Sequence, residues 1–201
     1  KKSMLSRYLT TGPEVKKFEN NFSDYTGSKF ALACNSGTAA LHMAFYGIGL
    51  KKNDNIILPS INFIAAANMC NQIGAKIYFA DVDPLTGQMT PETLINCIRN
   101  YKIKKIKAFC VMHNGGSPNN FRKFYNLKKR YKCFLVEDCC HSLGGKYSIS
   151  KKENVGKCKY SDVSTFSFHP VKSITTGEGG MLVTNNKKIY LKSKLLRNHG
   201  M

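Results

Sequence analysis

The feature that most constrains this chain is a regular alternation of short apolar runs with longer segments whose apolar residues recur every three or four positions. Short apolar runs are typical of buried strands, and periodic segments are typical of helices that cover a sheet. Strands that alternate with helices pair in parallel through right-handed crossovers. The sequence therefore predicts an α/β fold, a three-layer α/β/α sandwich around a mostly parallel sheet.

Turn and cap residues indicate where these elements begin. Gly12-Pro13-Glu14 and Thr90-Pro91-Glu92 each open an expected helix, because proline is favoured in the first helical turn. No linker or repeat divides residues 1–201, so we expect one domain. Strands are expected at 55–59, 76–79, 106–112, 133–136, 163–168 and 181–184, and further helices at 38–46, 63–73, 121–131 and from about 186.

Charge sets a second constraint, because 31 Lys and Arg oppose 12 Asp and Glu and the net charge is +19. Such a surface suits nucleic acid or acidic membranes. The excess is mostly lysine and is scattered, whereas base recognition and bidentate phosphate binding favour arginine. The dense runs at 102–107 and 128–132 fall at expected helix ends, where cations are favourable. We therefore expect a solvated basic surface without a nucleic-acid partner, and a nucleic-acid-binding protein remains the alternative.

The distribution of apolar residues indicates a core and no membrane anchor. No run reaches about 18 apolar residues, and residues 1–6 lack the apolar stretch of a signal peptide. Eight cysteines are spread through apolar segments without a Cys-x-x-Cys spacing. This usage is typical of buried thiols in a reducing compartment and does not favour a zinc site. We expect a cytoplasmic protein with no membrane partner and no metal.

Ligands of parallel α/β sheets bind beyond the carboxyl ends of the strands, so polar residues at those positions are candidates for a site. The turn from Asn35 to Leu41 leads small residues into a helix, which suits a phosphate group, although an ordinary capped helix has the same pattern. Glu137 and Asp138 end an apolar strand and are expected to point into the crevice, unless Asp138 only caps the next helix.

Two further candidates follow other strands. Lys172 lies in a Ser-, Thr- and Gly-rich loop between two apolar strands, where a desolvated amine can form a Schiff base; an ordinary surface lysine is the alternative. Phe63 follows a strand end, where an aromatic ring serves either the core or as a cover for a planar ligand.

Together these segments resemble the fold-type-I enzymes that use pyridoxal 5′-phosphate (PLP), specifically the DegT-type sugar-nucleotide aminotransferases. The resemblance covers nearly the whole chain, and Ser-Phe-His-Pro-x-Lys followed by Gly-Glu-Gly-Gly is its most specific signature. The matching segments, in family order and spacing, are 9–13, 35–41, 81–83, 113–118, 137–138, 167–180 and 197–200.

The resemblance implies a role for each candidate residue. Lys172, Asp138 and His141 are the implied catalytic residues. Lys172 would form the Schiff base with PLP and transfer protons, Asp138 would pair with the pyridinium nitrogen, and His141 would lie near the ring hydroxyl. The remaining cofactor-binding residues would be Phe63, stacked on the ring, and Gly37, Thr38 and Ser167, which would hold the phosphate.

The same resemblance implies an activity. Family members that retain the lysine favour transamination. The resemblance implies as substrate a nucleotide-linked 4-keto-6-deoxy sugar, with L-glutamate as amino donor, in surface-polysaccharide or glycan biosynthesis. The motifs are most similar to transaminases that form UDP-4-amino-4,6-dideoxy-N-acetylhexosamines. A GDP-perosamine-type or other keto-sugar aminotransferase is the first alternative, and a non-catalytic protein of the PLP fold is the second.

Length is where the chain departs from this family, whose members are about twice as long. The resemblance therefore implies that residues 1–201 form the large PLP-binding domain, without the smaller C-terminal domain. An Asn that reaches the phosphate of the neighbouring subunit would be missing as well. The full-length protein is expected to form a homodimer.

Overall fold

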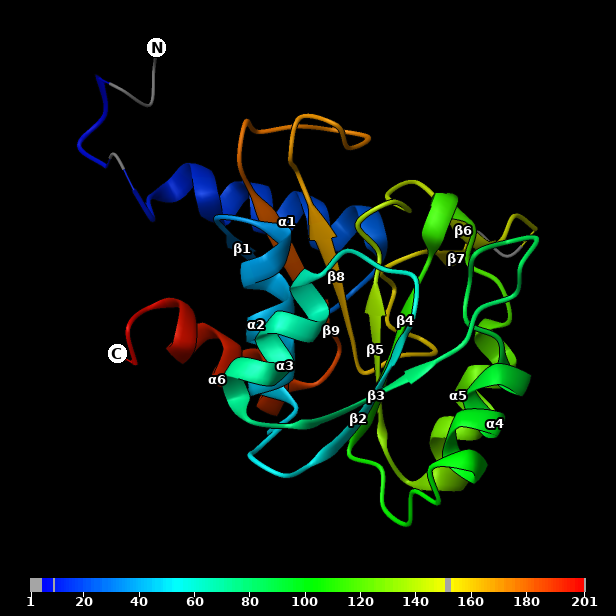
Figure 1. Cartoon of the computed structure of the whole chain (residues 1–201). Helices are drawn as coiled ribbons and strands as arrows, with labels where there is room; N and C mark the ends of the chain where they lie inside the picture. The colour runs from blue at the N-terminus through cyan, green and yellow to red at the C-terminus, as the bar shows by residue number, and fades with distance from the viewer. Residues whose placement is uncertain (1–4, 9, 151–152, 201) are drawn as a thin grey trace.

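A computed structural model describes residues 5–8, 10–150 and 153–200, and its elements follow the predicted alternation (Figure 1). Leu9 of the 9–13 segment and residues 1–4 of the N-terminal stretch lie outside the described residues. The helices are α1 (Pro13–Thr26), α2 (Gly37–Gly47), α3 (Ala65–Ile73), α4 (Pro91–Asn100), α5 (Phe121–Tyr131) and α6 (Lys187–Arg197). The strands are β1 (Phe30–Cys34), β2 (Asn55–Pro59), β3 (Lys76–Ala80), β4 (Ala108–Met112), β5 (Phe134–Asp138), β6 (Lys146–Ser148), β7 (Glu153–Asn154), β8 (Val163–Ser167) and β9 (Gly180–Thr184).

Seven of these strands form one sheet in the order β1-β9-β8-β5-β4-β2-β3. The pairs β2–β3, β2–β4, β4–β5 and β5–β8 are parallel, whereas β9 runs antiparallel to both β8 and β1. Strand β1 therefore has the same direction as β8, and only β9 is reversed within this sheet. The predicted mostly parallel sheet is confirmed, with β9 as the strand that runs against the others.

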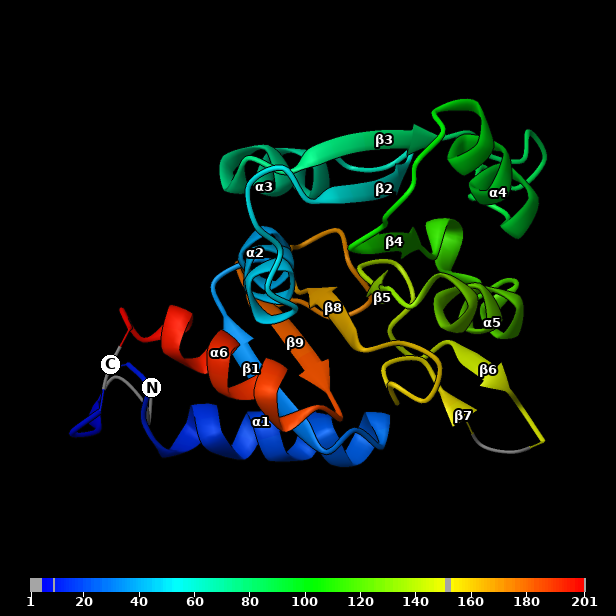
Figure 2. The ribbon, with the colours of Figure 1, turned by 90° about the horizontal axis from the view of Figure 1, so that it is seen from below.

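Helices cover both faces of the sheet and give the predicted three layers (Figures 1 and 2). One face packs against α2, α3 and α6 through Leu32, Phe45 and Val136, all fully buried. The opposite face packs against α4 and α5 through another cluster, and against α1 through a third. Alternate residues of one strand therefore enter different cores.

Local chemistry explains several element boundaries. The side chain of Ser36 accepts a hydrogen bond from the Ala39 N–H and so caps α2. Thr90 and Thr93 form a reciprocal capping box at α4. Helix α3 begins at Ala65, two residues later than expected, and ends before Gly74, which has the left-handed conformation typical of a helix C-terminus.

Three strands do not appear among the sequence predictions. Strand β1 lies at one edge of the main sheet, and β6 and β7 form a separate two-stranded hairpin. The residues of β6 and β7, Lys146–Ser148 and Glu153–Asn154, are mostly polar, so no apolar run marks them. Their pairing depends on contacts with other segments of the protein, so the local sequence pattern does not predict it.

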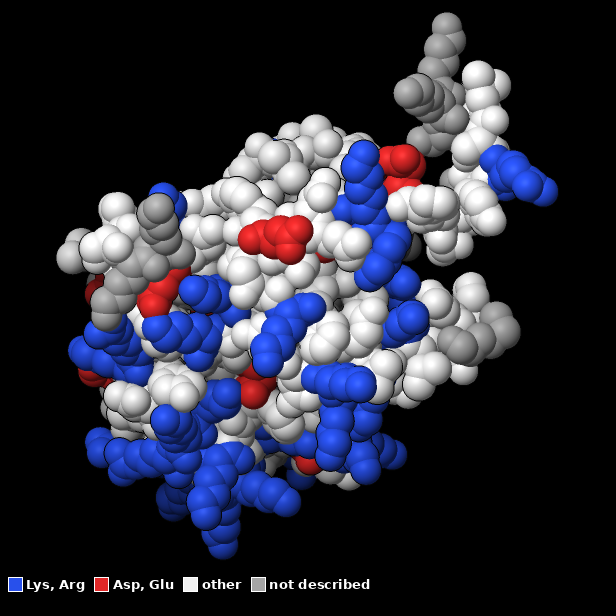
Figure 3. All heavy atoms as spheres, turned by 180° about the vertical axis from the view of Figure 1, so that it is seen from behind, with Lys and Arg blue, Asp and Glu red and all other residues white. Residues whose placement is uncertain are grey.

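The basic residues lie as the sequence predicts at the end of α5, where Lys128, Lys129 and Arg130 occupy the last turn. Figure 3 shows Lys and Arg gathered most densely at the lower end of the rear face, the end at which the parallel strands begin. Among the described residues, no helix combines the length and the apolar character that crossing a bilayer requires.

Candidate functional site

A cavity of about 390 Å³ lies at the carboxyl ends of β4, β5 and β8, beside the first turn of α2. This is the edge of the sheet at which ligands of α/β proteins bind. The walls of the cavity come from segments far apart in the sequence. They include the seven residues to which the resemblance assigns a catalytic or cofactor-binding role: Gly37, Thr38, Phe63, Asp138, His141, Ser167 and Lys172.

The first turn of α2 presents backbone amides and the positive end of a helix dipole to the cavity. Gly37 makes this approach possible, because a Cβ at that position would lie 2.8 Å from Ser167 Cβ and 3.2 Å from Cys140 Sγ. Thr38 and Ser167 add hydroxyl groups to the same wall. The arrangement suits a phosphate group.

Asp138 contributes a buried carboxylate to the cavity floor, with only 2% of the residue exposed. It ends β5 on the face that packs against α2, the face also occupied by Val136. The backbone N–H of Cys140 donates to Asp138 Oδ1 at 3.1 Å. A buried carboxylate with so few neutral donors favours a cationic or protonated partner in the cavity.

Glu137 does not line the cavity, which corrects the expectation that both acidic residues point into the crevice. Successive side chains of a strand alternate between faces. Glu137 therefore points to the side of Leu135, into the opposite half of the protein, where it is 2% exposed. There its carboxylate accepts hydrogen bonds from the Tyr147 and Ser164 hydroxyl groups.

Lys172 lies half-buried in the connection between β8 and β9, as the sequence predicts. Its backbone N–H donates to the His169 carbonyl at 2.9 Å. The base of this loop is closed by Phe168, whose N–H donates to Gly179 O and whose carbonyl accepts from Thr176 N. A lysine held on a hydrogen-bonded loop at a cavity is suited to covalent capture of a carbonyl group.

His141 lies within electrostatic range of both Lys172 and Asp138. Partial burial lowers the pKa of its imidazole, and the positive charge of Lys172 lowers it further, while the Asp138 carboxylate opposes the shift. Phe63 stands at the cavity with 70% of the residue exposed, so its ring is available to a planar ligand and does not belong to the core.

Several cavity residues were not singled out from the sequence, among them Cys140, Met112 and Glu178. Burial raises the pKa of the Cys140 thiol, and the neighbouring Asp138 carboxylate raises it further, so this sulfur stays protonated. Cys140 follows Asp138 by two positions, and Glu178 lies within the Gly-Glu-Gly-Gly segment. Both were therefore within reach of sequence reasoning, whereas Met112 belongs to a uniformly apolar strand.

Other segments of the family signature have structural contacts away from the cavity. Asp83 accepts hydrogen bonds from the Thr86 backbone and hydroxyl groups and so stabilises its own turn. Arg197 pairs with the Glu19 carboxylate and also donates to the Ala33 carbonyl at 3.3 Å, which joins the end of α6 to α1 and β1.

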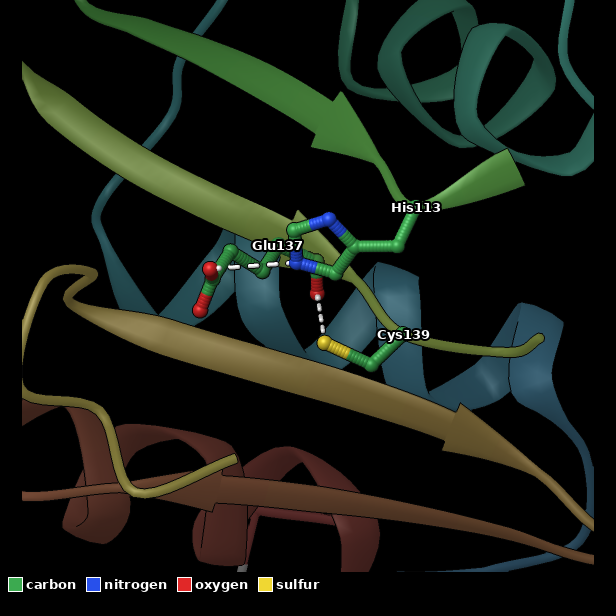
Figure 4. Close-up of side chains that lie close together, drawn as sticks. All are labelled: His113, Glu137 and Cys139. Atoms are coloured by element: carbon green, nitrogen blue, oxygen red, sulfur yellow. Dashed lines mark hydrogen bonds and ion pairs between the residues drawn. The ribbon is translucent and has the colours of Figure 1, made fainter. Parts of the chain in front are cut away.

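A second cluster of chemically active groups lies behind the cavity floor, formed by His113, Glu137 and Cys139 (Figure 4). Their potential ligand atoms all lie within 4.8 Å of one another. His113 Nε2 is 3.2 Å from Glu137 Oε1, and the Cys139 thiol donates to the Glu137 carbonyl at 3.8 Å. Burial raises the pKa of Cys139 well above its usual range. The spacing of these three residues along the chain does not predict that they meet. The hydrogen bonds between them account for their proximity.

Comparison with known proteins places these observations in context. The model of the DegT/DnrJ/EryC1/StrS aminotransferase family matches residues 1–201. The chain is 38% identical over 201 residues to the UDP-4-amino-4,6-dideoxy-N-acetyl-beta-L-altrosamine transaminase of Campylobacter jejuni strain 81-176, covering 100% of this chain and 51% of that protein. It is 36% identical over 190 residues to the GDP-perosamine synthase of Escherichia coli O157:H7, covering 94% of this chain and 50% of that protein.

A solved structure gives the same result. The fold matches Helicobacter pylori PseC, described as an aminotransferase involved in the biosynthesis of pseudoaminic acid, with a TM-score of 0.89 and 31% sequence identity. The match covers 100% of this chain and 52% of that chain. The present chain thus spans about half the length of the relatives that it matches.

Proposed function

Since the chain belongs to the DegT/DnrJ/EryC1/StrS aminotransferase family, we propose that its cavity binds PLP and serves transamination of a nucleotide-linked 4-keto-6-deoxy sugar. The observation that carries the proposal is the meeting of Lys172, Asp138 and the first turn of α2 in one cavity. An amine, a buried carboxylate and a helix N-terminus match the aldehyde, the pyridine nitrogen and the phosphate of PLP in turn.

Each residue then has a defined task. When bound, PLP supplies an electron sink that stabilises negative charge at the amino carbon of the substrate. Lys172 Nζ binds the cofactor and moves the proton to and from that carbon. Asp138 holds the proton on the pyridine nitrogen. His141 is placed to contact the hydroxyl group of the ring. Phe63 covers one face of the ring and helps to exclude water.

We propose further that the sugar is carried on UDP and is of the N-acetylhexosamine type, with L-glutamate as amino donor. The 38% identity to the altrosamine-type transaminase supports this choice. The GDP-perosamine synthase is nearly as similar at 36%, so a GDP-linked 4-keto sugar is the second candidate.

The architecture of the whole protein is part of the proposal. Residues 1–201 would be the large PLP-binding domain, and a smaller C-terminal domain and a second subunit would complete the site of a cytoplasmic homodimer. The half-length match to the relatives supports the first point. Exposed apolar residues next to the cavity support the second, since Phe63 and Val171 are 70% and 78% exposed.

A substrate comparison tests the proposal. The intact protein, supplied with PLP and L-glutamate, receives UDP-4-keto-6-deoxy-N-acetylhexosamine or GDP-4-keto-6-deoxymannose in parallel. Mass spectrometry follows the amino sugar, and a coupled assay follows 2-oxoglutarate. We expect kcat/KM to be at least about tenfold higher for the UDP substrate, a transition-state difference of roughly 1.4 kcal/mol.

Each other outcome has a separate meaning. A preference for the GDP sugar would replace the substrate and leave the transaminase intact. A stable PLP absorbance without turnover on either sugar would indicate a non-catalytic member of the family. Salt-dependent DNA binding without any PLP absorbance would favour the nucleic-acid alternative.

A further inference from the structure

The segment from Asp138 to Tyr147 carries three cavity residues, Asp138, Cys140 and His141. It leaves the main sheet at the end of β5 and reaches Tyr147 in β6, a strand of the separate β6–β7 hairpin. Most of it is a connecting loop, and loops are mobile unless they are tied to the scaffold. How its two ends are held therefore decides how firmly the cavity residues are placed.

One hydrogen bond joins the two ends of this segment. The Tyr147 hydroxyl donates to Glu137 Oε1 at 2.6 Å, and the two residues are 7% and 2% exposed. Glu137 immediately precedes Asp138, so the bond closes the segment at its base. The His141 carbonyl oxygen also lies close to Gly116, where a Cβ would come within 2.8 Å of it.

Glu137 is in turn fixed from two other strands. His113 Nε2, just after β4, lies 3.2 Å from Glu137 Oε1 (Figure 4). The Ser164 hydroxyl of β8 donates to Glu137 Oε2 at 2.9 Å. Burial by itself would raise the pKa of Glu137. Hydrogen bonding and the charge of His113, with hydrogen bonds from Ser161 and Tyr147, hold the pKa below its usual range. The carboxylate is therefore charged, and it binds its donors more strongly than a neutral acceptor would.

We propose that Glu137 and Tyr147 form a clamp that positions Asp138 and His141 toward the cofactor from the far side of the sheet. Neither residue of this Glu137–Tyr147 clamp touches the cavity, so both are positioning residues. The inference rests on the proposed PLP site and adds to it the device that keeps its carboxylate and imidazole in place. Pre-organisation of this kind lowers the cost of binding a ligand.

A pair of tyrosine variants tests the clamp. Tyr147→Phe removes only the hydroxyl and keeps the ring, which packs against Phe121 and Tyr160. Tyr160→Phe is the matched control, because the Tyr160 hydroxyl also donates to a buried carboxylate, Glu153 Oε2, at 2.9 Å. Both variants remove one buried hydrogen bond from the same aromatic cluster, but only one bond closes the segment.

The measurements are made on the intact protein and separate positioning from stability. We expect similar losses of thermal stability in the two variants. We expect the Kd for PLP to rise about tenfold in Tyr147→Phe, the size of one charge-assisted hydrogen bond, and less than about twofold in Tyr160→Phe. The pH at which the absorbance of bound PLP changes should shift in Tyr147→Phe alone, because the placement of Asp138 and His141 changes.

The result that would overturn the clamp is an equal change of Kd and of the absorbance profile in both variants. A stoichiometric metal ion bound through His113, Glu137 and Cys139 would overturn it as well, since Glu137 would then be a ligand. If the unsubstituted protein binds no PLP, the proposed function itself fails. Glu137→Gln gives a second check, and it should weaken PLP binding at least as much as Tyr147→Phe.

Discussion

Glu137 and Asp138 are adjacent on β5 and equally buried, yet their surroundings differ completely. Asp138 faces a cavity and accepts a hydrogen bond from the Cys140 N–H. Glu137 faces a packed interior, where Tyr147, Ser164 and His113 surround its carboxylate. The Asp138 carboxylate is available to a ligand, whereas the Glu137 carboxylate is bonded to side chains of the protein itself.

The comparison shows how one strand end serves two purposes. Alternation of side chains sends consecutive residues to opposite faces, so a site on one face can be supported by a network on the other. A network of side chains outside the cavity takes no space from the ligand, so its polar groups can all be hydrogen-bonded to one another and shielded from water. The residue that faces the ligand and the residue that holds the strand end in place therefore lie on opposite faces of the same sheet.

The largest expected effect concerns the cavity side. Lys172→Ala should abolish covalent trapping of PLP by borohydride and lower transamination by at least about a thousandfold, because both covalent capture and proton transfer are lost. Peptide mass mapping identifies the trapped lysine. Lys105→Ala, an exposed lysine at the opposite end of the sheet, should behave like the unsubstituted protein. Trapping on any other lysine would refute the role of Lys172.

The free energy of unfolding tests whether Glu137 and Asp138 have different roles. Glu137→Ala should lower the free energy of unfolding of the cofactor-free protein by about 3–5 kcal/mol, because it leaves buried His113 and Tyr147 without their partner. Asp138→Ala should cost less than about 1 kcal/mol, since it removes few hydrogen bonds, but it should lower PLP affinity. Urea denaturation measures both. Equal losses of stability would mean that the two carboxylates are not functionally divided.

The smallest expected effect is the titration of His141 in the cofactor-free protein. Its pKa should lie below 6.5, and Lys172→Met should raise it by removing a nearby cation. Because the folded-state pKa is depressed, the unfolded chain binds more protons below pH 6.5. Neutral His141 therefore makes its full contribution to stability above pH 6.5, and that contribution declines as the pH falls toward the folded-state pKa. Proton NMR of the imidazole follows the titration, and a midpoint above 6.5 would contradict the electrostatic arrangement.

The layered α/β fold, and seven of the residues that line the cavity, follow from the sequence alone. Apolar runs, helical periodicity and cap residues are local signals, and they placed β2 to β5, β8, β9 and all six helices within a few residues. The Ser167–Gly180 segment and Asp138 were recognisable because polar residues at strand ends of such a sheet face a common crevice.

The surroundings of each β5 carboxylate, by contrast, depend on how the whole chain packs. The reversed direction of β9, the polar strands β6 and β7, and the convergence of His113, Glu137 and Tyr147 all depend on contacts between segments distant in the chain. Local patterns carry no information on such contacts, because a buried polar group is stabilised by partners that only the packed fold brings within hydrogen-bond distance.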